Sequence, residues 1–420
     1  MSRPPARAWT LADAERHLLS LELFGMRFGL DRMRRLLTAL GSPQERFSSI
    51  HVVGTNGKSS TARMAAAILE AHGARAGAYL SPHLVSFAER VRVGERDAAP
   101  DELARAVQRA AAAAAKVDRT AAGDDRVTQF ETITAAAYLL LAESGVEVAA
   151  VEAGLGGRHD ATSVIGSSVQ VLTNVGLEHT RWLGPTVADI AREKLAVVRP
   201  GATLVVGSGL DPDALALARE TAADRAAELV VAAADPGVPL AAEGSFQRRN
   251  FALAAAAAEA LTGELDPAAV RRAAASVVVP GRMQVVGRDP LTIVDGAHNP
   301  AGALALAESL REIAGGRRLA LVISILDDKD APGMLRALVD GADLVVATGN
   351  HNPRALPPAT LASLAGQLGA RACEVEPDPR RALERAREAT GAGGVAVAAG
   401  SIYLAGDLLA PVGRRAVSSL

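Results

Sequence analysis

Short apolar runs alternate with longer segments of helical character along the first two thirds of the chain. Runs rich in Val, Ile and Ala predict buried strands at 49–53, 147–152, 168–174 and 203–206. Helices are expected between them at 61–72, 132–143 and 187–197. Because buried strands that alternate with helices are typical of a mostly parallel sheet covered on both faces, the pattern predicts an α/β fold.

The same alternation starts again near residue 290. Apolar runs predict strands at 291–295, 318–323, 344–347 and 394–398, with a helix at 301–313 after the first of them. We therefore expect a second, smaller α/β domain of the Rossmann-like kind. The boundary is placed at the Pro280-Gly281-Arg282 segment, which gives an N-terminal domain of residues 1–281 and a C-terminal domain of residues 282–420.

Composition excludes several classes of protein. The 45 Lys and Arg residues nearly balance the 47 Asp and Glu residues, so no basic excess favours nucleic acid or an anionic membrane surface. Aromatic residues make up only 3% of the chain, which argues against base stacking, and the single cysteine, Cys373, excludes an internal disulfide. Neither a secretory signal nor an apolar run of roughly 20 residues is visible. These observations predict a cytoplasmic protein with no nucleic-acid or membrane partner.

A glycine-rich turn lies between the first predicted strand and the first predicted helix. It consists of Gly54, Thr55, Asn56, Gly57, Lys58, Ser59 and Ser60. Glycines let successive N–H groups face phosphate oxygens at the start of a helix, and the lysine reaches the β- and γ-phosphates. A hydroxyl of Ser59 or Ser60 could approach Mg²⁺. The turn is shorter than the full phosphate-loop pattern, but its place between strand and helix predicts an ATP site.

Further motifs follow this loop in a fixed order. They are Ser81-Pro82-His83-Leu84 with Glu89-Arg90-Val91-Arg92-Val93, Thr128-Gln129-Phe130-Glu131, Glu152-Ala153-Gly154-Leu155-Gly156-Gly157-Arg158-His159-Asp160-Ala161-Thr162, Thr173-Asn174-Val175-Gly176-Leu177-Glu178-His179-Thr180, Ile190-Ala191-Arg192-Glu193-Lys194, Pro280-Gly281-Arg282 and Asp295-Gly296-Ala297-His298-Asn299-Pro300. In this order they resemble the folylpolyglutamate synthase family of the Mur ligase superfamily. One motif alone would be a weak signal, whereas the ordered set is highly specific. Glu178 stands where that family usually has aspartate.

The resemblance implies a Mur-ligase-like ATPase domain, a C-terminal domain and an ATP-dependent ligase. Such an enzyme phosphorylates the carboxylate of dihydropteroate or of a tetrahydrofolate tail, and the amino group of L-glutamate then displaces phosphate. The resemblance also implies ATP and Mg²⁺, with two magnesium sites expected, and a further monovalent cation. A monomer is the default that it suggests.

Residue roles follow from the same resemblance. It implies magnesium ligands at Ser81, Glu152 and His179, and a carbamylated Lys194 beside the metal. Nucleotide contacts are implied, in addition to the loop, at Asn250, Arg282, Asp295 and His298. Lys58, Glu152, His179 and Lys194 are the expected catalytic set.

The pterin site is expected at Thr128, Phe130, Arg158 and Asp160. Phe130 could stack on a flat ring and Asp160 could accept N–H bonds, while Arg158 would orient the acid. Plain roles compete with these: Phe130 as core, Asp160 as a helix cap, Lys194 on a solvated helix face, and Asp295 in a structural turn. For the whole chain, the alternatives are another Mur-type amino-acid ligase, a phosphate-loop NTPase switch, or a binding protein without catalysis.

Overall fold

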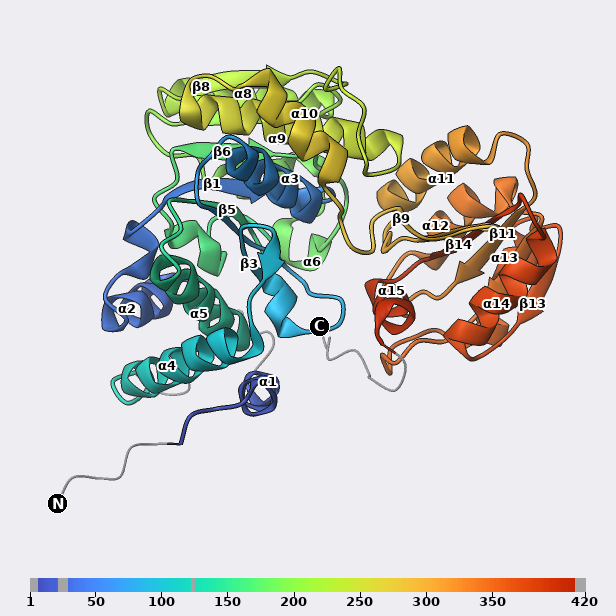
Figure 1. Cartoon of the computed structure of the whole chain (residues 1–420), viewed down its shortest axis with the longest axis horizontal. Coiled ribbons are helices and arrows are strands. Elements are labelled where there is room, and N and C mark those ends of the chain that lie inside the picture. Colours follow the sequence, from blue (N-terminus) through green and yellow to red (C-terminus); the bar gives the residue numbers. More distant parts are fainter. Residues whose placement is uncertain (1–6, 22–28, 122–124, 412–420) are drawn as a thin grey trace.

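The computed structural model describes residues 7–21, 29–121 and 125–411. The chain forms two α/β units that lie side by side, the first drawn in blue to yellow and the second in orange and red (Figure 1). The first unit contains an eight-stranded sheet and the second a six-stranded sheet. The predicted boundary between residues 281 and 282 falls between helix α10 (Pro267–Ser276) and strand β9 (Gln284–Arg288).

The first sheet is parallel except at one edge. Its strands lie in the order β4-β3-β2-β5-β1-β6-β7-β8, and the antiparallel pairings are those of β3 with β2 and with β4. The strands are β1 (Ser48–Val53), β2 (Ala76–Tyr79), β3 (Val91–Val93), β4 (Arg96–Asp97), β5 (Val148–Glu152), β6 (Val169–Leu172), β7 (Thr203–Gly207) and β8 (Glu228–Ala232). The register sets Val52 of β1 beside Glu152 of β5, so the carboxyl ends of the two central strands open at the same edge.

Helices cover both faces of this sheet. Successive side chains of a strand point to opposite faces, and those of β5 are buried on both. Ala149 and Val151 pack with one group of helices and Ala150 with the other. The first group is α1 (Leu11–Ser20), α2 (Asp31–Ala39), α4 (Pro100–Asp118) and α5 (Gln129–Glu143), and the second is α3 (Lys58–Ala71), α9 (Ser245–Thr262) and α10. Three further helices follow β6 and β7, namely α6 (Thr180–Leu183), α7 (Val187–Leu195) and α8 (Pro212–Asp224).

The second unit repeats the plan on a smaller scale. Its sheet has the order β13-β12-β11-β14-β10-β9, in which only β9 is antiparallel. The strands after β9 are β10 (Leu291–Val294), β11 (Leu319–Ile323), β12 (Leu344–Ala347), β13 (Cys373–Val375) and β14 (Val395–Ala399). The helices are α11 (Pro300–Ala314), α12 (Ala331–Leu338) and α13 (Pro358–Gln367) on one face, and α14 (Pro379–Thr390) and α15 (Ile402–Leu409) on the other.

The two units meet along α9 and α11. The backbone N–H of Ser245 donates to Oγ of Ser309 over 3.1 Å, and Arg248 pairs with Glu312 at 3.3 Å. The predicted α/β class, with a mostly parallel sheet in each of two units, is confirmed. In the part of the chain that the structure describes, none of the helices has the length and apolarity needed to cross a membrane.

Candidate active site

A cavity of about 1220 Å³ lies at the carboxyl ends of the central strands and is lined by both units. Open α/β sheets hold their ligands at this edge because the loops that follow the strands converge there. We call the part around residues 54–60 and Glu152 the phosphate end, and the part around Thr128, Phe130 and Asp160 the pterin end. Arg282, Asp295 and His298 line the same cavity from the second unit.

The phosphate loop joins β1 to α3 as the sequence predicts. Gly57 caps α3 with a φ of 83°, and a Cβ at this position would lie 2.5 Å from Oδ1 of Asn250. Only glycine satisfies both the left-handed backbone and this close approach. Lys58 is the first residue of α3, and its Nζ donates to the carbonyl of Thr55 over 3.0 Å. The ammonium group therefore lies beside the N–H groups that open the helix, where an anion is stabilised.

Glu152 ends β5 and faces the start of α3. Its Oε1 accepts a hydrogen bond from the Ser59 hydroxyl and its Oε2 accepts one from the Ser81 backbone N–H, both over 2.8 Å. The side chain is buried, and burial raises the pKa of Glu152 although Lys58 acts in the opposite direction. Two of the three predicted magnesium ligands, Ser81 and Glu152, are thus brought together with a hydroxyl of the phosphate loop.

His179 follows β6 in a left-handed conformation, with a φ of 52°. Burial lowers the pKa of His179 to about 4, and the ammonium groups of Lys329, Lys58 and Lys194 add to this shift. The imidazole is therefore neutral at pH 7, which is the form that binds metals. It contacts Glu178, with Nε2 at 4.0 Å from Oε1. Among the described residues no three His, Cys, Asp or Glu side chains form a ready metal cluster, and the predicted set includes a serine.

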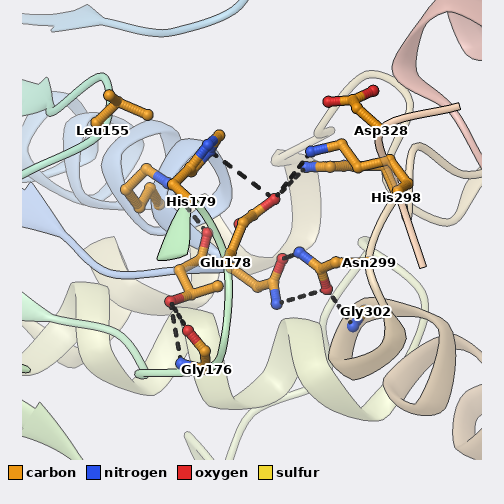
Figure 2. A network of polar contacts seen from close by, with 12 residues as sticks. Leu155, Gly176, Glu178, His179, His298, Asn299, Gly302 and Asp328 are labelled. Carbon is orange, nitrogen blue, oxygen red and sulfur yellow. Dashed lines mark hydrogen bonds and ion pairs between the residues drawn. The ribbon is translucent and has the colours of Figure 1, made fainter. Parts of the chain in front are cut away.

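Glu178 is one of the residues through which the first unit meets the second near the phosphate end (Figure 2). Its Oε1 lies 3.2 Å from Nε2 of His298 and 3.6 Å from Nζ of Lys329. Burial alone raises the pKa of Glu178, but His298 and the nearby cations outweigh burial and lower it overall. Glu178 and Lys329 were not among the site residues predicted from the sequence. Glu178 does lie within one of the family-like motifs, at a position where the family usually has aspartate.

Lys194 lies on α7 and is only 2% exposed, so the solvated-face interpretation is wrong. Its Nζ donates to the carbonyls of Gly54 and Leu155, each over 2.9 Å. Burial, followed by the charge of Lys58, lowers the pKa of Lys194 to about 7. A substantial fraction of the amine is therefore unprotonated near neutral pH, as carbamate formation requires.

The predicted nucleotide residues of the second unit make local contacts as well as facing the cavity. Asp295 is buried and accepts the backbone N–H groups of Met283 and Ala297 over 2.8 and 2.7 Å. Burial raises the pKa of Asp295 despite the nearby Arg282. A Cβ at Gly296 would overlap the guanidinium of Arg282, so the glycine is needed for this arginine to lie against the turn. The predicted nucleotide residue Asn250 belongs instead to α9 of the first unit, and its side-chain amide donates to Oε1 of Gln247 over 3.0 Å.

The pterin end is held mainly by bonds to its own backbone. The Thr128 hydroxyl caps α5 and also donates to Glu131 over 3.1 Å. Asp160 accepts the N–H groups of Gly156 and Thr162 over 3.0 and 2.9 Å. Phe130 lines the cavity with its ring 6.4 Å from that of Tyr79.

Arg158 differs from the other three predicted pterin residues. Its side chain is exposed and is not part of the cavity lining, while its backbone N–H donates to Glu193 over 2.9 Å. Its predicted contact with the acid therefore has no support from its position.

Residues 281–402 match the family model described as the glutamate ligase domain of Mur ligases. A Mycobacterium tuberculosis dihydrofolate synthase/folylpolyglutamate synthase is 35% identical over 86% of this chain and 81% of its own length. The chain belongs to the dihydrofolate synthase/folylpolyglutamate synthase family. It is accordingly an ATP-dependent ligase.

Other relatives extend this family likeness. A probable bifunctional folylpolyglutamate synthase/dihydropteroate synthase of Haloferax volcanii is 35% identical over 94% of this chain, which spans 50% of that protein's length. A Mycobacterium tuberculosis folylpolyglutamate synthase solved with ADP and AMPPCP superposes with a TM-score of 0.87, at 32% identity over 94% of this chain and 98% of that one. A bifunctional Yersinia pestis synthase solved with AMPPNP and manganese gives 0.85, at 29% identity over 97% and 99%.

Proposed function

We propose that the protein joins L-glutamate to dihydropteroate, to the glutamyl tail of tetrahydrofolate, or to both, through an acyl phosphate. The observation that carries this proposal is the single cavity in which Lys58 and Glu152 of the first unit face Arg282 and His298 of the second. An acyl-phosphate ligase needs cations and fixed donors around a transferring phosphoryl group more than it needs a nucleophile. The cavity offers that chemistry, and its volume of about 1220 Å³ exceeds the roughly 300–1,000 Å³ of ordinary ligand pockets.

Lys58 and Arg282 would stabilise the charge that develops on the phosphoryl oxygens. The loop residues 54–60, Asn250, Asp295 and His298 would hold the nucleotide. Ser81, Glu152 and the neutral His179 would hold divalent metal at two sites, since hydroxyl, carboxylate and imidazole groups all face the phosphate end. Bound Mg²⁺ would supply Lewis-acid stabilisation of the phosphates. The solved Yersinia pestis relative contains manganese with an ATP analogue, which supports this assignment.

Phe130 is our candidate for stacking on the pterin. Thr128 and Asp160 would approach the same ring with the acceptor capacity that their backbone bonds leave. Glutamate would enter from the second unit, and its amine would attack the acyl phosphate while the units exclude water. A monomeric state, a cytoplasmic location and a monovalent cation stay predictions from the sequence.

Two other functions compete with this proposal. Another Mur-type ligase would use the same phosphate end with a cell-wall precursor, and the pterin end argues against it. A phosphate-loop switch would need no second unit that brings Arg282, Asp295 and His298 to the nucleotide.

Release of ADP distinguishes these functions. The protein is supplied with ATP, Mg²⁺, glutamate and one acid at a time. Release with dihydropteroate establishes the synthase step, and release with tetrahydrofolate establishes tail extension. Release only with a muropeptide precursor would overturn the folate assignment, and glutamate-independent hydrolysis would favour a switch.

Carbamylation of Lys194 has its own test. We expect ¹³C-labelled bicarbonate to give a carbamate resonance in the wild-type protein that is lost in Lys194→Ala. Acetate should restore part of the activity of Lys194→Ala by replacing the missing carboxylate. Full activity of Lys194→Ala without acetate would contradict the carbamate.

A further inference from the structure

The phosphate loop is fastened directly to the second unit by a pair of asparagines. Nδ2 of Asn56 donates to Oδ1 of Asn299 over 3.2 Å, and Nδ2 of Asn299 donates back to Oδ1 of Asn56 over 3.0 Å (Figure 2). Asn299 is buried. Two reciprocal bonds between planar amides fix both distance and orientation, because each bond weakens steeply when the angle changes.

The backbone of Asn56 is already held by its own unit. Its N–H donates to Oδ1 of Asn174 over 2.9 Å, and its carbonyl accepts from the Thr173 hydroxyl over 2.7 Å. Both partners follow β6, the strand next to β1. The backbone of Asn56 is thus held in place by residues of the first unit, and its side-chain amide is left to bond to the second unit.

Asn299 is anchored with equal firmness on the other side. It is the N-cap of α11, and its Oδ1 accepts the backbone N–H of Gly302 over 2.8 Å. His298 immediately precedes it, and Asp295 lies at the start of the same turn. A displacement of Asn299 therefore displaces the residues that we assign to the nucleotide.

We propose that Asn56 and Asn299 are a positioning pair that sets the register of the two units across the active site. The pair touches no reacting atom in this role. It fixes Lys58, two residues after Asn56, relative to Asp295 and His298, so that both units contact one nucleotide. The nearby contact of Glu178 with His298 and Lys329 also bridges the units, but it is ionic and weakens with salt. The neutral amide pair supplies a geometric constraint that does not depend on ionic strength.

The test is a double-mutant cycle of Asn56→Ala, Asn299→Ser and the double variant. Serine caps a helix about as well as asparagine, so Asn299→Ser keeps the cap of α11 but cannot reach Asn56. We expect each single variant to lower kcat/KM by about tenfold, the scale of two neutral hydrogen bonds. The double variant should be no worse than either single variant, because the second substitution removes nothing further. The coupling free energy that the cycle gives for the two residues should be the same at low and high salt.

Asp330→Ser is the matched control. Asp330 caps α12 of the same unit by accepting the backbone N–H of Gly333 over 2.8 Å, so the exchange repeats the cap change away from Asn56. It should leave kcat/KM unchanged. Losses that multiply in the double variant, or an Asn299→Ser enzyme with wild-type kcat/KM, would overturn the pair.

The catalytic readout depends on the proposed function, so binding of AMPPNP with Mg²⁺ is measured in the same four proteins. Each single variant should bind AMPPNP about tenfold more weakly than the wild type. The double variant should bind it no more weakly than either single variant. If the wild-type protein releases no ADP with any acid, the proposed function fails while the binding cycle still decides the pair. Independent losses of affinity would show that Asn56 acts on the nucleotide without Asn299.

Discussion

The phosphate end and the pterin end of the cavity use their polar side chains differently. At the phosphate end, groups from separate strands and from both units meet one another, as in the contacts of Glu152 with Ser59 and of Glu178 with His298. At the pterin end, Thr128 and Asp160 bond to backbone and side-chain groups within four residues of themselves.

Two predicted site residues with large pKa shifts belong to the phosphate end. Burial and neighbouring cations lower the pKa of Lys194 to about 7 and that of His179 to about 4, and both residues lie at or beneath the phosphate end. Shifts of this size cluster at functional sites because they arise from charges held together out of water. Residues of the family motifs thus play different roles at the two ends of the cavity. Substitutions at both ends test this difference, and their expected effects range from the largest at the phosphate end to the smallest at the pterin end.

The largest effect is expected for Lys58→Ala. Removal of this ammonium from the start of α3 should lower kcat about 10²- to 10³-fold, or about 3–4 kcal/mol, the scale of losing a key charge stabiliser. Steady-state ADP release gives the measurement. Lys116→Ala, an exposed lysine on α4, is the control and should be neutral. Near wild-type turnover of Lys58→Ala would remove the phosphate end from the mechanism.

Glu152→Gln should separate activity from stability. The raised pKa means that the folded protein binds this proton more tightly than the unfolded chain, so the charge at Glu152 costs stability at pH 7. We expect activity to fall about 10²-fold, a loss comparable to that of an oxyanion donor, while Tm rises. The exposed Glu220→Gln on α8 should change neither. A lower Tm together with retained activity would make Glu152 a structural residue.

Lys194 should make stability depend on pH. Its pKa in the folded state, about 7, lies below the ordinary value of 10.5, so between these values the unfolded chain binds more protons. The free energy of unfolding should therefore rise with pH over this range, by up to about 1.4 kcal/mol per pH unit. The wild type is compared with Lys194→Met by chemical denaturation at pH 7 and 9, in buffers freed of carbon dioxide. Equal slopes for the two proteins would contradict the lowered pKa.

The smallest effect is expected at the pterin end. Thr128→Ala should lower the free energy of unfolding by about 1 kcal/mol through loss of the α5 cap. Because the hydroxyl is already bonded to Glu131, its proposed contact with the pterin is weak. KM for dihydropteroate should therefore rise by less than about threefold, well below the effect of losing one hydrogen bond to a charged group. Thr10→Ala removes the same type of cap from α1 and is the matched control. A tenfold rise in KM for Thr128→Ala alone would show a strong contact with the pterin and would contradict the difference between the two ends.

Local pattern was sufficient for most of the fold. The central strands of both sheets, the phosphate loop and helices such as α7 and α11 lie within a few residues of their predicted bounds. The predicted elements did not include the internal strand β2, the antiparallel strands β3, β4 and β9, the parallel edge strand β8 or the short β13. Three of these strands, β3, β4 and β13, have only two or three residues, which is too few to produce a period, and edge pairing depends on the neighbouring strand.

The sequence by itself determined the α/β class, the phosphate loop and the order of the site motifs, because strand periodicity, glycine and the strand–turn–helix context are local properties. Tertiary structure alone decided which of these residues meet. It buried Lys194 against the phosphate loop, left Arg158 outside the cavity, and paired Asn56 with Asn299. Such contacts join residues up to 243 positions apart, and their burial and charge depend on packing that no short segment encodes.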